Sequence, residues 1–406
     1  MTSLHDPAAA VRLAASLIET DTANPPGGEA LAAGLVARHL TDHGVTAEIR
    51  AWGDGRANLI ARLDGTDPGA PALLLNGHLD TVGLGSQPWT VDPLGGAVEG
   101  GRLYGRGSSD MKGGAAAMVV AFERLAAAWE SSPGRWPVVL ALTAGEETGC
   151  EGARLIAGDL PRVGAIVVGE ATAAHVVVGH KGLMWARLEA RGSAAHASQP
   201  SLGRNAIAGL ASVIGRINDI DPALLAPESE LGLPTIVATM IGGGTGRNVV
   251  PDFCSCTLDV RLTSTFGESQ ASRVLHDISA GADVTVEVDL VIPPVLSKAG
   301  DPWVESVLTM TGDHGVRRTA SYFTDASVLG PALGDPPVCI VGPGEPALAH
   351  RVDEWCSVTA IERCADLYEA IARDWSAASS RRGLSDTESI HSGAKGNHDG
   401  TSSQAA

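Results

Sequence analysis

Acidic and imidazole side chains follow four of the short apolar runs in this sequence. In chain order these are His78 and Asp80 at the end of the run that begins at residue 73, Glu146 and Glu147 after 138–144, Glu170 after 165–169, and His350 on the loop after 338–341. Short apolar runs bounded by turn residues predict buried strands, and the carboxyl ends of strands in an open α/β sheet form the edge where ligands bind. One such carboxylate is typical of a turn, whereas four strand ends together predict a functional site.

A further acid, Asp110, lies on a glycine-rich stretch just before a predicted buried helix. Gly105, Gly107 and Gly113 surround it, and the alanine-rich run 114–129 has helical periodicity. The helix dipole favours a carboxylate at this point. Considered alone, Asp110 fits an N-cap residue. Considered together with the acids at the strand ends, it is predicted to belong to the functional site that they form.

Two histidines and several carboxylates, without cysteine, are the ligand chemistry of zinc, cobalt or manganese in a hydrolytic site. Asp80 lies two residues after His78, so on a strand both side chains project to one side and the aspartate can orient the imidazole. Glu146 and Glu147 are adjacent and diverge in extended chain, which suits one metal ligand and one free base.

The predicted cofactor is a pair of divalent metal ions. A carboxylate has two oxygens and can bridge two cations, which lie roughly 3.5–4 Å apart in two-metal sites. Asp110, on its loosened loop, is the predicted bridge. Zinc is the expected ion, and cobalt or manganese would suit the same ligands.

Composition limits the class of protein. The 406 residues suggest two to three domains, and 44% hydrophobic content suffices for a large core. A net charge of -18 without a basic stripe disfavours nucleic acid and anionic membrane as partners. The first 20 residues have neither a basic leader nor a continuous apolar core, so no signal peptide or membrane span is predicted.

Six scattered cysteines without a C-x-x-C pair predict a reducing, cytoplasmic location instead of a disulfide framework. Cys254 and Cys256 would share one face of a predicted strand. A zinc pair is one interpretation of that spacing, and ordinary core burial is the favoured one.

The order of elements predicts an α/β fold with an inserted module. Helical patterns at 8–18, 31–40 and 114–129 alternate with apolar runs at 57–63, 72–75, 138–142 and 165–168, which predicts a largely parallel sheet. Between 181 and 292 the order changes to β-α-β-β-α-β, a compact α+β module. The predicted division is 1–180 and 293–375 for the two parts of a catalytic domain, 181–292 for the insertion, and 376–406 for a disordered tail.

Five motifs resemble those of the M20 metallopeptidase family, in the family's order over about residues 7–375. They are Gly77-His-Leu-Asp-Thr-Val82, Gly105-Arg-Gly-Ser-Ser-Asp-Met-Lys-Gly-Gly114, Ala144-Gly-Glu-Glu-Thr-Gly149, Gly169-Glu-Ala-Thr172, and Gly342-Pro-Gly followed by Ala349-His-Arg-Val-Asp-Glu354. That family includes acetylornithine deacetylase, succinyl-diaminopimelate desuccinylase, aminoacylase and glutamate carboxypeptidase. The resemblance implies a zinc-peptidase-like catalytic domain.

The resemblance also implies roles for the site residues. It assigns one metal to His78, Asp110 and Glu170, the other to Asp110, Glu147 and His350, and the role of base to Glu146. It further implies a cis peptide bond between Asp110 and Met111.

The predicted insertion resembles the family's lid and dimerisation domain, so a homodimer is expected. His196, in Gly192-Ser-Ala-Ala-His196, matches a histidine that reaches the partner's active site in relatives and steadies the oxyanion. Asn248 and Arg261 match substrate-binding positions, and Lys181 stands where relatives often have a basic residue. Without the family, His196 reads equally well as a strand-end hydrogen bonder, Asn248 as a turn residue and Arg261 as a surface cation.

The predicted function is metal-assisted hydrolysis of the amide bond of an N-acyl amino acid or small peptide with a free carboxylate. The segment Ser321-Tyr-Phe-Thr-Asp-Ala326 resembles acetylornithine deacetylase and aminoacylase more than the desuccinylase, so an acetylornithine-deacetylase-like enzyme is expected, with the acyl group open. Alternatives are a dipeptidase or carboxypeptidase of the same family, and a non-catalytic binding homologue. The last would be expected to lack ligands that are all present here. A carrier with one structural zinc would favour cysteine ligands.

Overall fold

The computed structural model describes residues 8–391 apart from residues 68, 130 and 132–134, with side chains described as far as residue 376. Its main element is a nine-stranded sheet in which eight strands form one path and β14 (Arg318–Ala320) pairs with β8. The path runs β1 (Ala47–Ala51), β2 (Ala57–Leu63), β6 (Val138–Thr143), β3 (Ala72–His78), β7 (Val163–Val168), β15 (Val338–Ile340), β8 (Val177–His180) and β13 (Val295–Leu296).

The four central strands of this sheet are parallel. β6, β3, β7 and β15 pair in parallel register, with His78 opposite Thr143 and Asn76 opposite Val168. β1, β2 and β13 pair antiparallel at the two edges. The largely parallel central sheet predicted from the sequence is therefore confirmed, and the carboxyl ends of its central strands meet at one edge.

Helices cover both faces of the sheet because strand side chains alternate between two cores. Leu73 and Leu75 of β3 belong to the core on one face, whereas Leu74 belongs to the core on the other. The first core contains α1 (Ala9–Glu19), α2 (Glu29–Asp42), α3 (Gly113–Trp129), α8 (Pro302–Thr311) and the packed part of α10 (Val358–His391). The second contains α4 (Glu151–Ile156) and α9 (Ala326–Ala332).

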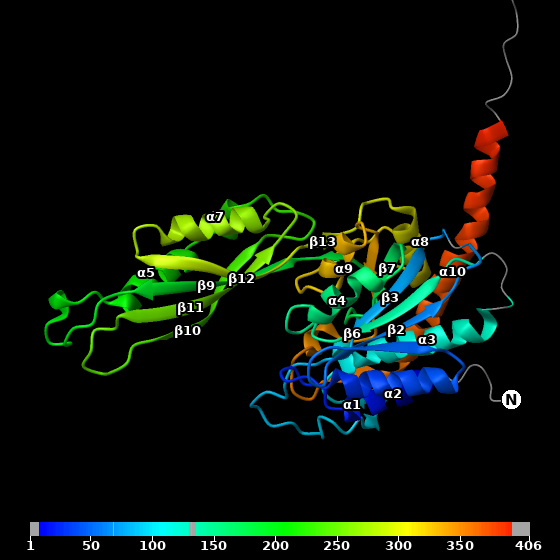
Figure 1. The fold of residues 1–406 in the computed structure, drawn as a ribbon, viewed down its shortest axis with the longest axis horizontal. Helices are drawn as coiled ribbons and strands as arrows, with labels where there is room; N and C mark the ends of the chain where they lie inside the picture. Colours follow the sequence, from blue (N-terminus) through cyan, green and yellow to red (C-terminus); the bar gives the residue numbers. More distant parts are fainter. Residues whose placement is uncertain (1–7, 68, 130, 132–134, 392–406) are drawn as a thin grey trace, which may run out of the picture.

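A second, four-stranded sheet lies to one side of this body (Figure 1). Its antiparallel strands run β10 (Thr235–Gly243), β11 (Phe253–Leu262), β9 (Gly182–Arg191) and β12 (Val284–Ile292). The helices α5 (Ala206–Asn218) and α7 (Glu268–Ser279) pack on it around a core of its own, which includes Cys254 and Cys256. Its element order matches the predicted β-α-β-β-α-β order, with the short α6 (Pro222–Leu225) in addition. Its role as a lid or dimerisation domain, and the predicted domain boundaries, stay predictions.

A small three-stranded sheet joins distant parts of the chain. β16 (Trp355–Ser357) pairs with β5 (Arg102–Tyr104), which pairs with β4 (Val98–Glu99). The segment before β16 therefore lies beside the loop after β5, which carries Asp110.

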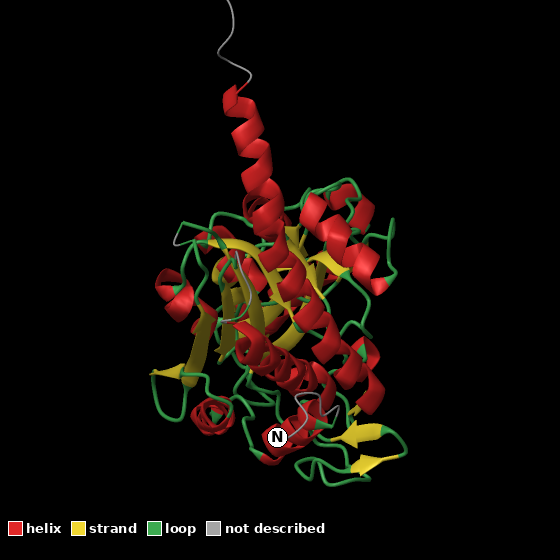
Figure 2. Cartoon of the chain, turned by 90° about the vertical axis from the view of Figure 1, so that its right-hand side faces the viewer, coloured by secondary structure: helices red, strands yellow, loops and turns green. Residues whose placement is uncertain are grey.

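The last helix differs from the sequence expectation. The prediction of a disordered tail began at residue 376, but α10 continues to His391 and projects from the molecule (Figure 2). No proline interrupts residues 376–391, and adding a residue to an existing helix needs no new nucleus. Residues 392–406 lie outside the described part of the chain. In the part that is described, no helix has both the length and the apolar character needed to cross a membrane.

Candidate active site

The side chains predicted to form a site converge at the carboxyl edge of the central sheet. His78 ends β3, Glu146 and Glu147 follow β6, Glu170 follows β7, and His350 lies beyond β15. Asp110 comes from η1 (Ser108–Lys112), the turn that leads into α3. The parallel register of the four strands brings these residues together from positions far apart in sequence.

Asp110 lies between the two histidines. Its Oδ1 is 3.2 Å from His78 Nε2, and its Oδ2 is 3.3 Å from His350 Nε2. His78 Nε2 is also 3.4 Å from Glu170 Oε1, and His350 Nε2 is 3.1 Å from Glu147 Oε2. The donors therefore form two groups that share Asp110.

Asp80 lies beneath this cluster and holds both glutamates. The Nδ1 of His78 is 2.9 Å from the main-chain oxygen of Asp80 and 3.5 Å from its Oδ1. The Asp80 carboxylate accepts hydrogen bonds from the backbone N–H groups of Glu146 and Glu147, both at 3.2 Å, and from Asn24 Nδ2 at 3.1 Å. The backbone carbonyl of Asp80 thus orients the imidazole of His78, and its side chain holds the backbone of Glu146 and Glu147 in place.

The two adjacent glutamates have different surroundings. Glu147 faces His350, whereas Glu146 is buried and groups with His78 and Glu170. Burial, reinforced by the charge of Glu170, raises the pKa of Glu146 well above its usual range even though His78 opposes the shift. A carboxyl group with a raised pKa can both accept and return a proton near neutral pH.

The donor atoms fit divalent transition metals. Two sets of three residues have their ligand atoms within 4.8 Å of one another: His78, Asp110 and Glu147, and His78, Glu146 and Glu170. Each set combines imidazole nitrogen with carboxylate oxygen, which zinc and cobalt accept. Burial and the neighbouring charge of Asp110 raise the pKa of Glu170 to about 7, so a cation would relieve repulsion among these carboxylates.

Ion binding at His350 would release a proton. Hydrogen bonds to Asp110 and Glu147 raise the pKa of His350 to about 10. An imidazole must be neutral to bind a metal, so an ion that takes its place between these carboxylates displaces that proton.

The loop that carries Asp110 is held by Glu354, a residue to which the sequence assigned no role. Glu354 is fully buried, and its Oε1 accepts hydrogen bonds from the backbone N–H groups of Ser109 at 2.8 Å and Asp110 at 3.1 Å. Its Oε2 accepts from the N–H of Gly107 at 3.1 Å and from Arg106 Nη1 at 2.6 Å. The expected cis peptide bond between Asp110 and Met111 is present in this loop.

A cavity of about 560 Å³ opens onto the cluster. Two cations line it together with Tyr322: Lys181, directly before β9, and Arg261, next to the last residue of β11. Lys181 Nζ donates to the carbonyl of Leu233 at 2.6 Å. Arg261 Nε donates to Asp259 Oδ1 at 2.8 Å and holds its guanidinium beside the cavity.

His196 and Asn248 lie elsewhere on the second module. Both are exposed, His196 forms a bridge with Val249, and the carbonyl of Asn248 accepts from Ala197 N at 2.8 Å. Neither belongs to the described residues that line the cavity. Within one chain the structure therefore brings Lys181 and Arg261 to the site, but not His196 or Asn248.

Sequence reasoning also missed polar residues beneath the site. Asp325, buried at the start of α9, hydrogen-bonds to Thr143 at the end of β6. Asn24 hydrogen-bonds to Asp80 from 56 residues earlier in the chain. Asp325 lies in the segment 321–326, whose resemblance to the family was the one indication of a role for this residue. No pattern in the sequence indicated a role for Asn24.

Comparison with known proteins places this geometry in a family. The sequence matches peptidase family M20/M25/M40 over residues 74–374. A relative from Ruegeria, named succinyl-diaminopimelate desuccinylase 2, is 32% identical over 391 residues, covering 90% of this chain and 94% of the relative. A relative from Staphylococcus aureus, named a probable succinyl-diaminopimelate desuccinylase, is 30% identical over 391 residues, covering 87% of this chain and 95% of the relative.

Solved structures share the fold. The chain is similar to an M20 family metallo-carboxypeptidase from Sulfolobus solfataricus, with a TM-score of 0.72 and 19% identity over 89% of this chain and 98% of that one. It is also similar to human carnosine dipeptidase 1, with a TM-score of 0.66 and 16% identity over 89% of this chain and 95% of that one. The family resemblance is confirmed: the chain belongs to peptidase family M20/M25/M40.

Proposed function

We propose that this family M20 hydrolase cleaves the amide bond of an N-acyl amino acid or small peptide that carries a free carboxylate. The observation that supports this most is the convergence of two imidazoles and four carboxylates at the floor of a cavity that two cations also line. The floor suits metal-assisted hydrolysis, and the cations suit an anionic substrate.

In this proposal His78, Asp110 and Glu170 hold one divalent ion and Asp110, Glu147 and His350 hold the other, with Asp110 shared. The ions, zinc being the expected one, would polarise the scissile carbonyl and make water a stronger nucleophile. The donor set suits cobalt and manganese as well.

Glu146 is the proposed base. Its carboxylate takes the proton of the attacking water and gives it to the leaving nitrogen, a role that a raised pKa favours. The hydrogen bonds of Asp80 to the two backbone N–H groups keep Glu146 and Glu147 in their separate directions.

Arg261 and Lys181 are the proposed anchors for the carboxylate. The guanidinium can grip a carboxylate through two parallel hydrogen bonds, and Lys181 adds a second positive charge on the same cavity. Two cations would also match a substrate with two carboxylates, and two relatives carry names of desuccinylases. An N-succinyl substrate is therefore the second candidate beside the N-acetyl substrate that residues 321–326 favour.

His196 and Asn248 are proposed to act from a second subunit. Because they are exposed and do not line the cavity of their own chain, a homodimer through the second module would let them reach the partner's site. His196 would then donate a hydrogen bond to the oxyanion of the tetrahedral intermediate.

A hydrolysis screen tests the proposal. N-acetyl, N-succinyl and N-formyl amino acids and dipeptides would be offered to the protein with added zinc or cobalt, and again after chelation. Release of the amino acid from at least one N-acyl class or from dipeptides, lost on chelation and regained with metal, is expected. No turnover in any class by a metal-loaded protein would contradict an amide-hydrolase function.

A further inference from the structure

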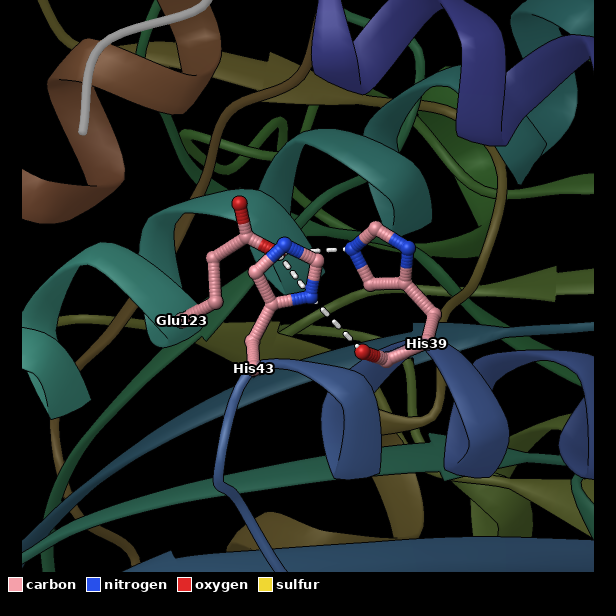
Figure 3. A group of neighbouring side chains, drawn as sticks. All are labelled: His39, His43 and Glu123. Carbon is pink, nitrogen blue, oxygen red and sulfur yellow. Dashed lines mark hydrogen bonds and ion pairs between the residues drawn. The ribbon is translucent and has the colours of Figure 1, made fainter. Parts of the chain in front are cut away.

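Two histidines and one glutamate cluster on the helical layer away from the active site (Figure 3). His39 lies in the last turn of α2, His43 caps the end of that helix, and Glu123 projects from α3. Glu123 is ten residues after Gly113, so it lies roughly 15 Å along α3 from the loop that carries Asp110. The cluster is therefore separate from the candidate active site.

Both imidazoles face the same carboxylate oxygen. His39 Nε2 lies 2.6 Å from Glu123 Oε2, and His43 Nδ1 lies 3.6 Å from that oxygen. The centroids of the two rings are 4.7 Å apart. One ligand atom from each of the three residues lies within 4.8 Å of the other two, so a single ion can contact all three side chains.

Charge and access also favour a cation here. The C-terminal end of α2 attracts positive charge through the helix dipole. The side chains of His39, His43 and Glu123 are 22%, 48% and 12% exposed, so an ion can enter from solvent and water can complete its coordination.

We propose that His39, His43 and Glu123 form a metal site that binds a divalent transition ion such as Zn²⁺ and links α2 to α3. Histidines four residues apart share one side of a helix, and two imidazoles with one carboxylate suit Zn²⁺, Co²⁺, Ni²⁺ or Cu²⁺. Mg²⁺ prefers oxygen ligands and is not expected to bind. When Zn²⁺ binds, it replaces the proton between His39 and Glu123, and that proton passes to solvent. His43 Nδ1 then gives up the hydrogen bond that it donates to the carbonyl oxygen of His39, and the ring takes up a proton at Nε2 in exchange for the one lost from Nδ1.

The test counts zinc in tag-free protein that already carries its resident metals. Zn²⁺ is added in excess, unbound ion is removed by gel filtration, and bound zinc is measured by elemental analysis. Wild type should retain one equivalent more than His43→Gln, in which the substituted side chain is about half exposed. The comparison is a difference between two proteins, so it holds whatever number of ions the active site takes.

A matched control is available on α7. The Nδ1 of His276 lies 2.8 Å from the carbonyl oxygen of Ser272, which is the contact that His43 Nδ1 makes with His39 at 2.8 Å. His276 is exposed but is not among the described residues that form a three-donor cluster. His276→Gln should therefore keep the additional equivalent.

A second readout is the thermal unfolding midpoint. Zn²⁺ should raise it in wild type and His276→Gln more than in His43→Gln, because an ion that binds only the folded protein stabilises it. Mg²⁺ should produce no such difference. Equal zinc content in wild type and His43→Gln would overturn the proposal and leave the cluster as an ion pair between two helices. Glu123→Gln should lose the equivalent too; if it fails to fold, the His43→Gln comparison decides.

Discussion

Glu354 should control both the stability of the protein and its affinity for metal. In Glu354→Gln, the amide oxygen can replace one carboxylate oxygen, but the amide NH₂ cannot accept a hydrogen bond. Each oxygen of Glu354 accepts two bonds, so the substitution leaves two of the four donors without an acceptor. If the NH₂ group takes the place of Oε1, the backbone N–H groups of Ser109 and Asp110 lose their acceptor. If it takes the place of Oε2, Arg106 and the N–H of Gly107 lose theirs.

The expected loss is large. Hydrogen bonds to a charged group contribute about 1.5–3 kcal/mol each, so two of them amount to about 3–6 kcal/mol of the free energy of unfolding. The ion pair between Glu354 and Arg106 gives a second, similar figure. Removing one partner of a buried ion pair costs about 3–5 kcal/mol. Loss of a residue that positions a ligand weakens metal binding by roughly ten- to hundred-fold.

Denaturant unfolding of the metal-free protein and competition with a chelating dye measure the two effects separately. Glu99→Gln is the matched control, because Glu99 lies in β4 of the same small sheet and is exposed; it should behave as wild type. A Glu354→Gln protein with wild-type unfolding energy and wild-type metal affinity would refute the role assigned to this carboxylate.

Three further predictions concern the substrate anchor, a buried histidine and the second subunit. Arg261→Ala should lower kcat/KM for carboxylate substrates by roughly thirty- to several-thousand-fold, since removing one partner of a buried charged pair costs about 2–5 kcal/mol; if the variant still prefers the acid over a neutral amide analogue as strongly as wild type, Lys181 is the better candidate. Burial lowers the pKa of His180 from 6.5 to about 4, so the unfolded chain binds its proton more readily, and the stability is present above pH 6.5 and lost as pH falls toward 4. The metal-free protein should lose about 3 kcal/mol over that interval through this group, and His180→Gln should lose correspondingly less; identical pH slopes would refute the assignment. Mixing inactive His196→Ala with inactive Glu146→Ala subunits should restore part of the activity, because one hybrid site contains both wild-type residues; no recovery after verified subunit exchange would argue against action across subunits.

The main helices and strands were predictable because apolar periodicity carries them. The predicted strand 57–63 has the bounds of β2, and the predicted strand 138–142 covers β6 except for its last residue. Edge strands such as β13, with two residues, are too short to leave a periodic signal. The end of α10 was missed because the residues after 376 are mostly polar, although no proline interrupts them and the helix continues through Gly383.

The residues of the candidate site could likewise be predicted only in part. Residues that follow apolar runs, such as His78 and Glu170, could be predicted because parallel strands end at one edge. Glu354 could not, since its hydrogen bond to Gly107 spans 247 residues and no local pattern indicates that pairing. The place of His196 could not be read from local sequence either, because within one chain His196 is not among the described residues that line the cavity.

The division of roles between Glu146 and Glu147 is the most direct test of the proposed mechanism. Metal content and kcat would be measured together for Glu146→Gln and Glu147→Gln. The first variant should keep its metal and lose roughly a hundred- to ten-thousand-fold in kcat, the usual contribution of a general base. The second should lose metal, because Glu147 and Asp110 both lie beside His350, and these three residues are the proposed ligands of one ion. Equal metal content with equal, mild losses of rate in both variants would contradict a glutamate base beside a metal centre.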